Sequence, residues 1–176
     1  MFLKSQLSWN VVIPAENLDS EGLMLQKAIL IHLLEDFSAK KASKEIGYFM
    51  AITTLDRIGE GKIRQHTGDL IFPVDFSCIT FKICPGEVLE GVAHKILKHG
   101  VFLRCGPTEK VYLSHNKMAG YEYVPGENPI FKSDKSPKIE KGTVIRFVVL
   151  AEKYDEAERD FRAIVSLDGD YLGPIS

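Results

Sequence analysis

The stretch GEVLEGVAHKILKHGVFLRCGPTEKVYLSHNKM, from Gly86 to Met118, decides the fold of the second half of this chain. It holds three apolar-rich runs that lie close together and are broken by Gly91, Gly100 and Gly106. Glycine inside a strand marks a bulge or a bend. The spacing therefore predicts short strands that curve around a small barrel, with a bulge at Gly91.

The rest of the second half extends this pattern to five strands. We expect them at residues 87–97, 100–105, 110–115, 143–154 and 159–167. Residues 116–142 are rich in proline and glycine and predict one long loop between the third strand and the fourth. Five short strands with a long connection after the third are typical of an OB-type Greek-key barrel.

The first half predicts an α+β arrangement. Residues 2–13 read as a strand, and Ser20 and Glu21 are suited to the start of a helix that runs to about Lys40. Further strands are expected at 47–54, 62–66, 69–74 and 76–84, punctuated by Gly68 and Pro73. The fold class is thus an α+β domain over residues 1–84, followed by an all-β OB-fold barrel over residues 85–176.

The expected helix is apolar on two sides. At 100° per residue one face gathers most of its large apolar side chains, while Met24 and Ile31 fall on another. The first face holds Leu23, Ile29, Leu30, Leu33, Leu34 and Phe37. Such a helix is either buried in a core or packed between its own sheet and a partner, and the small size of this half favours a partner.

Composition excludes several classes of protein. A net charge of −2 excludes a polycation that coats nucleic acid, and no apolar run approaches the roughly 20 residues that span a bilayer. The three cysteines and five histidines lack the spacings of zinc sites. Asp168-Gly169-Asp170 reads as a turn, and no G-x-S-x-G elbow exists. We expect no catalytic residues, no metal, no cofactor and no membrane partner.

The charge is nevertheless uneven along the chain. Residues 87–118 carry five basic and three acidic side chains, a balance of +2, whereas residues 152–170 carry three basic and seven acidic ones, a balance of −4. A mildly positive region on a near-neutral protein is suited to weak, salt-sensitive contact with a nucleic acid that is already held nearby.

The expected binding face follows from strand alternation. Phe102 and Arg104 share the outer face of their strand, Tyr112 lies on the same side of the next strand, and His99 lies at the rim. Aromatic rings stack on nucleic-acid bases, and arginine adds cation–π and phosphate contacts. Alternatively, Phe102 and Tyr112 are a cross-strand pair that only stabilises the sheet, and barrels of this class also bind proteins and sugars.

Two segments carry a family resemblance. LDRIGEGKIRQHTGDLIFPVDFSCITFKICPGEVLEGV, residues 55–92, resembles the domain junction of the seventh subunit of eukaryotic RNA polymerase II and its archaeal counterpart, and DGDYLGPIS, residues 168–176, resembles that family's ending. TTLDRIGEGKIRQHTG, HKILKHGVFLRCGP and VPGENPIF resemble the versions in plant RNA polymerases IV and V more than the polymerase II form. Those two enzymes serve RNA-directed DNA methylation and gene silencing.

The resemblance implies a non-catalytic stalk subunit of a nuclear DNA-directed RNA polymerase. Its N-terminal tip would dock on the polymerase core, and its barrel, of the ribosomal S-one type, would project outward. Its partners would be the core subunits, a fourth-subunit homologue and nascent single-stranded RNA. Two other interpretations stay open: a barrel that binds only protein, and a free-standing RNA-binding factor.

The family's stacking positions fall on His99, Phe102 and Tyr112. His99 replaces a usual phenylalanine, so the resemblance implies weaker, pH-sensitive stacking there. Together with strand alternation, it predicts that RNA is contacted by Lys95, Lys98, His99, Phe102, Arg104 and Tyr112.

Overall fold

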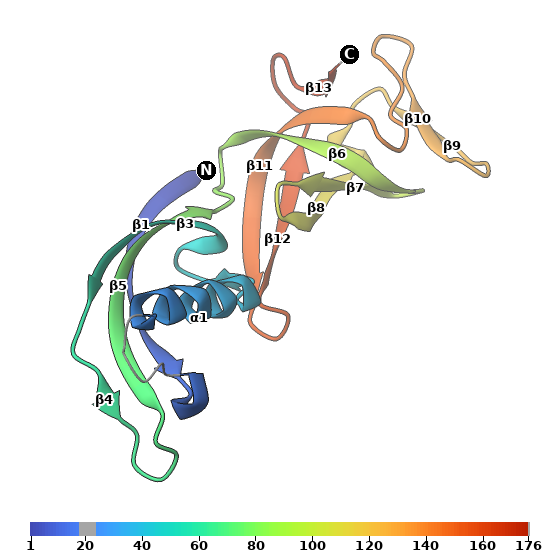
Figure 1. The fold of residues 1–176 in the computed structure, drawn as a ribbon. Helices are drawn as coiled ribbons and strands as arrows, with labels where there is room; N and C mark the ends of the chain where they lie inside the picture. Colours follow the sequence, from blue (N-terminus) through green and yellow to red (C-terminus); the bar gives the residue numbers. More distant parts are fainter. Residues whose placement is uncertain (18–23, 176) are drawn as a thin grey trace. The chain divides into compact units, whose positions relative to one another are not determined.

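The computed structural model describes residues 1–17 and 24–175. The protein is mostly β, with one α-helix among the described residues, and it divides into two compact units (Figure 1). One unit comprises Phe2–Lys82, and the other comprises Ile83–Ser176 together with Met1. The expected helix start at Ser20 and Glu21, and the apolar Leu23, lie outside the described residues.

A twisted antiparallel sheet forms most of the N-terminal unit. Its strands run in the order β1-β5-β3-β2, and β4 also pairs with β5. Their bounds are β1 Phe2–Ile13, β2 Ala42–Ser43, β3 Gly47–Ile58, β4 Lys62–Ile63 and β5 Leu70–Phe81, and a short 3₁₀ helix η1, Ala15–Asn17, follows β1. The first strand has the predicted bounds, whereas the strand expected at 62–66 is reduced to two residues.

One helix, α1 (Leu25–Ala39), packs on one face of this sheet (Figure 1). Ile29, Leu33 and Phe37 recur at every fourth position and are buried against the sheet, as helical periodicity predicts. Leu30 and Leu34 were expected on the same face, but they remain 37% and 47% exposed. The placement of Leu30 and Leu34 on the buried face is therefore wrong. They lie beside Ile31, which is 44% exposed, on a second apolar side that the sheet does not cover.

The break expected around Pro73 is absent, because β5 is one continuous strand. The Pro73 carbonyl accepts a 2.7 Å hydrogen bond from the Gly59 N–H, just beyond the end of β3 at Ile58. The nitrogen and carbonyl of one residue point to the same side of an extended strand. Pro73 therefore places its missing N–H where the neighbouring strand has already ended, so no ladder hydrogen bond is lost.

The second unit contains a closed five-stranded barrel. Its strands are β6 Val88–Leu97, β7 Gly100–Cys105, β8 Thr108–Ser114, β11 Val144–Asp155 and β12 Asp160–Ser166. They follow the order β12-β8-β7-β6-β11, and pairing of β11 with β12 closes the barrel. The β8–β12 pair is parallel and the others are antiparallel. Every strand predicted for this half is present, with bounds within two residues of those expected.

The barrel interior is filled by alternate residues of each strand. Val101, Leu103, Val111 and Leu113 are fully buried, whereas the residues between them face outward. The bulge predicted at Gly91 is wrong, because the register of β6 shifts between Ala93 and Lys95 instead. Gly91 lies instead at a crowded point, where a Cβ would be 3.0 Å from the Arg104 carbonyl oxygen and 3.1 Å from the Phe147 ring.

The segment between β8 and β11, expected as one loop, has structure of its own. It contains η2 (His115–Lys117) and a hairpin of β9 (Glu122–Val124) and β10 (Ile130–Lys132). Phe131 is fully buried and packs against His115 and Tyr123, each with ring centroids 5.5 Å away. These contacts, which join residues far apart in the sequence, give the hairpin a small core. A last strand, β13 (Gly173–Ile175), pairs with β11.

Within the described ranges, no helix is both long and apolar enough to cross a membrane.

Candidate nucleic-acid interface

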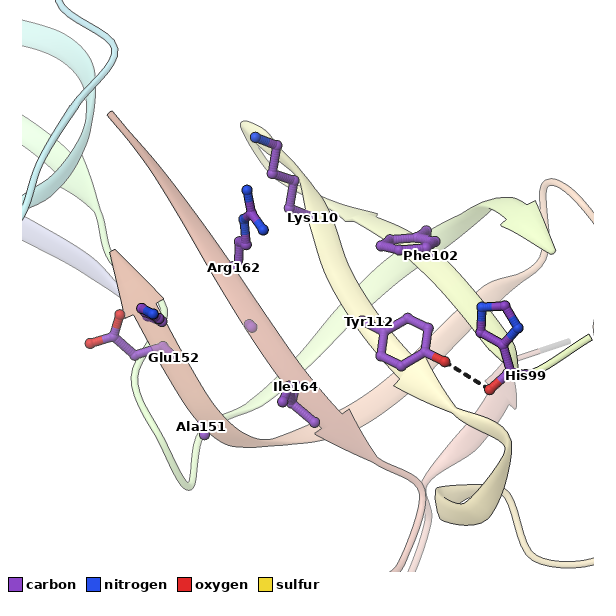
Figure 2. Close-up of a pocket in the computed structure, with 10 residues that line it drawn as sticks. His99, Phe102, Lys110, Tyr112, Ala151, Glu152, Arg162 and Ile164 are labelled. Atoms are coloured by element: carbon purple, nitrogen blue, oxygen red, sulfur yellow. Dashed lines mark hydrogen bonds between the residues drawn. The ribbon is translucent and has the colours of Figure 1, made fainter. Parts of the chain in front are cut away.

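A groove of about 590 Å³ lies on the outer face of the barrel (Figure 2). It crosses strands β7, β8, β12 and β11 and includes the turn before β7. The residues that line it are His99, Phe102, Lys110, Tyr112, Ala151, Glu152, Lys153, Arg162, Ala163 and Ile164.

Two aromatic rings form the centre of this groove. Phe102 and Tyr112 are directly opposite each other on β7 and β8, and their ring centroids are 5.1 Å apart at an interplanar angle of 48°. Both side chains are half-buried, so each ring keeps an accessible surface. The His99 ring lies 6.5 Å from that of Tyr112, and the Tyr112 hydroxyl donates a 2.8 Å hydrogen bond to the His99 carbonyl (Figure 2).

The aromatic pair continues into an apolar row that the sequence did not reveal. Tyr112 pairs with Ile164 on β12, which in turn pairs with Ala151 on β11. Ile164 is 50% exposed although it is a large apolar side chain in a strand. Alternation within residues 159–167 places Arg162 and Ile164 on the same side of their strand. Only the parallel pairing of β8 with β12 shows that this side is the one that carries Tyr112.

Three cations lie at one end of the same groove: Lys110 on β8, Arg162 on β12 and Lys153 on β11. Lys110 and Arg162 are paired with carboxylates at the turn between β11 and β12, one in the turn and two at the strand ends beside it. The hydrogen bond with Glu158 is the main cause that raises the pKa of Lys110 above its usual value, and the same bond lowers the pKa of Glu158. Sequence reasoning placed none of these cations in the site.

The structure brings together only half of the predicted contact residues. His99, Phe102 and Tyr112 line the groove. Lys95 is exposed on β6 opposite Phe102, whereas Lys98 is exposed in the turn after β6. Arg104 is exposed on β7 beyond the edge of the groove. None of these three cations lines the groove that holds the aromatic pair.

The described residues hold no group of three or more histidine, cysteine, aspartate or glutamate side chains placed to bind a metal ion. Cys78 and Cys105 are buried, and burial raises the pKa of the Cys105 thiol to about 11. A thiol in that state is a poor nucleophile at neutral pH, since the thiolate is the reactive form.

Comparison with known proteins places the chain in a family. No family model matches it. The chain is 62% identical to DNA-directed RNA polymerase V subunit 7 of Arabidopsis thaliana, over 100% of this chain and 99% of that protein. It is 55% identical to polymerase IV subunit 7 of the same plant, over 99% of each chain. Identity to polymerase II subunit RPB7 of Glycine max is 30%, over 88% of this chain and 87% of that one.

Among solved structures, an exosome complex RNA-binding protein aligns with 55% of this chain and 49% of its own, at 20% identity and a TM-score of 0.38. The polymerase V and IV relatives match this chain over nearly their whole lengths. Their order of identity confirms the expected likeness to the polymerase IV and V forms over the polymerase II form. This chain belongs to the subunit 7 family of DNA-directed RNA polymerases.

Proposed function

We propose that this chain is a non-catalytic stalk subunit of a nuclear DNA-directed RNA polymerase of the plant IV/V type. Its N-terminal unit is the tip that docks on the polymerase core, and it pairs there with a fourth-subunit homologue. Its barrel contacts nascent single-stranded RNA. The observation that carries the proposal is 62% identity to a polymerase V subunit 7 over almost the full length of both chains.

The barrel supports the RNA contact. Its strand order, with a meander of three strands and closure through β11 and β12, supports the expected OB-fold. The half-buried rings of Phe102 and Tyr112 offer a stacking platform, and stacking of one base on an aromatic ring is worth about 1–3 kcal/mol. Every base has a π-face, so we expect little sequence preference.

The second side of α1 supports association with another polymerase subunit. Leu30, Ile31 and Leu34 are 37–47% exposed on consecutive turns of the helix. Beside them, Leu34 and Met50 of β3 help to line a hollow of about 560 Å³. Contiguous apolar surface of this kind is typical of protein interfaces.

The similarity to subunits of polymerases IV and V supports a nuclear localisation of this chain. The relatives with 62% and 55% identity are named as subunits of polymerases V and IV. A chain that serves such an enzyme works in the nucleus, in RNA-directed DNA methylation and gene silencing.

A tagged purification from native extract, with mass spectrometry of the large co-purifying chains, tests the assignment. We expect the largest subunit of polymerase IV or V and a fourth-subunit homologue. The exposed pair Leu30→Ser with Leu34→Ser should reduce this recovery without loss of folding, and Val124→Ser, a similarly exposed apolar residue of the barrel unit, should not. Recovery of no polymerase subunit would contradict the stalk assignment.

Fluorescence anisotropy with a short labelled single-stranded RNA tests the barrel. The double variant Phe102→Ala with Tyr112→Ala should lose most of the affinity, whereas Tyr171→Ala, which removes a 92% exposed ring outside the groove, should bind normally. Affinity should also fall with salt, with a slope of about −0.7 per phosphate neutralised. Unchanged RNA affinity in the folded double variant would show that the Phe102–Tyr112 pair does not stack on RNA. No RNA binding by the native chain would favour a barrel that binds only protein.

A further inference from the structure

A row of three cations runs beside the apolar row of the groove. Lys153 of β11 is directly opposite Arg162 of β12. Val111 and Ala163 are partners in the parallel β8–β12 pair, so the residues that precede them, Lys110 and Arg162, are also neighbours. Figure 2 shows the Lys110 and Arg162 side chains extending from adjacent strands at the same end of the groove.

The two rows have the spacing of a strand repeat. Lys110 and Tyr112 are two residues apart on β8, and Arg162 and Ile164 are two residues apart on β12. Outward-facing neighbours on one strand are about 7 Å apart. The groove therefore presents the two aromatic rings and Ile164 along one line, and positive charge along a parallel line. A single-stranded RNA with stacked bases and a phosphate backbone beside them has the same arrangement.

Two of these cations, Lys110 and Arg162, already form ion pairs with carboxylates. Glu158 pairs with Lys110 and, at 3.6 Å, with Arg162. Asp160 lies 3.2 Å from Lys110, and Asp155 lies 3.0 Å from Arg162. Lys153 has no ion-pair partner among the described residues, although it lines the same groove.

The three carboxylates differ in their ability to move. Asp160 has a side chain only 4% exposed and accepts the Phe161 N–H at 3.0 Å. Asp155 accepts the N–H groups of Ala157 and Glu158 and so holds the turn. The Glu158 side chain is 49% exposed, and its interactions within the described ranges are those with the two cations. An exposed pair of this kind contributes little, so its rearrangement is cheap.

We propose that Lys110, Arg162 and Lys153 form a phosphate-binding row for the RNA backbone, in which Glu158 occupies the place of a phosphate until RNA displaces it. This inference rests on the proposed RNA contact of the barrel and deepens it. The bases stack on the Phe102–Tyr112 platform while the backbone crosses β8, β12 and β11. The acidic turn between β11 and β12 therefore lowers RNA affinity by competing for the cations that the RNA uses.

The full-length chain and a labelled single-stranded RNA test this row. Glu158→Gln keeps the shape of the side chain and removes its charge, and we expect RNA affinity to rise about two- to five-fold, the range of an exposed ion pair. Glu109→Gln is the matched control, because it makes the same charge change one residue from Lys110, on an exposed side chain outside the groove. It should leave affinity nearly unchanged.

A mutant cycle separates competition from general charge removal. Lys110→Gln with Arg162→Gln should weaken RNA binding, and Glu158→Gln added to that pair should then have no effect, because the cations that it competed for are gone. An equal gain from Glu158→Gln and Glu109→Gln, no gain, or a gain that persists without the two cations would each overturn the inference. Thermal unfolding of each variant confirms that it is folded.

The outcomes also distinguish this inference from the proposed function. Suppose that Phe102→Ala with Tyr112→Ala abolishes RNA binding but Glu158→Gln does not change RNA affinity. The aromatic platform is then supported, and the phosphate row is wrong. If the intact chain does not bind RNA at moderate salt, the proposed RNA contact and the phosphate row are both wrong, while the stalk assignment still depends on the purification.

Discussion

The Tyr112 hydroxyl donates a 2.8 Å hydrogen bond to the backbone carbonyl of His99, and this bond holds the ring against the turn between β6 and β7. Gly100 lies at the point of contact. A Cβ on Gly100 would be 2.7 Å from the Tyr112 hydroxyl oxygen and 2.4 Å from the Leu113 carbonyl oxygen. The absence of a side chain at position 100 thus leaves room for the Tyr112 ring and its hydroxyl.

Gly100→Ala should therefore lower the stability of the protein. The Leu113 carbonyl belongs to the β-sheet backbone and cannot move aside cheaply, so we expect a loss of about 1–3 kcal/mol in the free energy of unfolding, as for other overpacked sites. Urea denaturation measures this. The control is Gly126→Ala, where a Cβ would meet nothing within 4 Å. Equal stability of the two variants would contradict the close packing of Tyr112.

Two substitutions at Tyr112 separate the ring from its hydroxyl. Tyr112→Phe keeps the ring and loses the bond to His99, so RNA affinity should change less than about two-fold, with a stability loss of about 0.5–1.5 kcal/mol. Tyr112→Ala removes the ring and should cost about 5-fold to 150-fold in affinity, the equivalent of one stacked base. Similar affinities for the two variants would show that the ring does not stack on RNA.

The barrel could be predicted from sequence because its strands alternate cleanly. Val101 and Leu103 on one strand, and Val111 and Leu113 on the next, are fully buried, and this pattern fixes which side faces the core. The aromatic pair followed from the same rule, because Phe102 and Tyr112 occupy the intervening positions. Local periodicity thus sufficed wherever neighbouring strands are joined by short turns.

The rest of the groove could not be predicted, because it depends on pairing between distant segments. Ile164 meets Tyr112 only through the parallel β8–β12 pair, and periodicity within one segment contains no information on its partner strand. The strand break predicted around Pro73 was wrong for a related reason. A proline is tolerated in β5 because β3 ends beside it. The sequence alone does not tell where a neighbouring strand ends.

Acid should weaken the N-terminal sheet through Asp56. Hydrogen bonds from the hydroxyls of Thr54 and Ser77 are the main causes that lower the pKa of Asp56 below its ordinary value of 3.8. A lowered folded-state pKa stabilises the fold above the unfolded pKa, and this contribution disappears as pH falls through the folded pKa. Asp56→Asn should therefore be less stable than the native chain near neutral pH, and the difference should shrink below about pH 4.

Urea denaturation of both proteins across this pH range gives the comparison. The matched control is Asp134→Asn, which makes the same substitution at an exposed carboxylate of the second unit. A stability difference between Asp56→Asn and the native chain that is constant from neutral to acidic pH would show that the hydroxyls of Thr54 and Ser77 do not favour the ionised carboxylate.

The three thiols should differ sharply in reactivity toward a thiol reagent at pH 8. Burial raises the pKa of Cys105 to about 11, so only about a thousandth of it is thiolate at that pH, and the reagent cannot reach it in the folded barrel. Cys78 is equally buried, and burial raises its pKa too. Cys84 is half-buried and is the one that solvent reaches.

We expect one thiol to react rapidly with the reagent in the native chain and three in denaturant. Cys84→Ser should remove the rapid reaction in the native chain. Rapid labelling of Cys105 in the native chain would mean that the barrel opens readily, which the closure of β11 on β12 opposes.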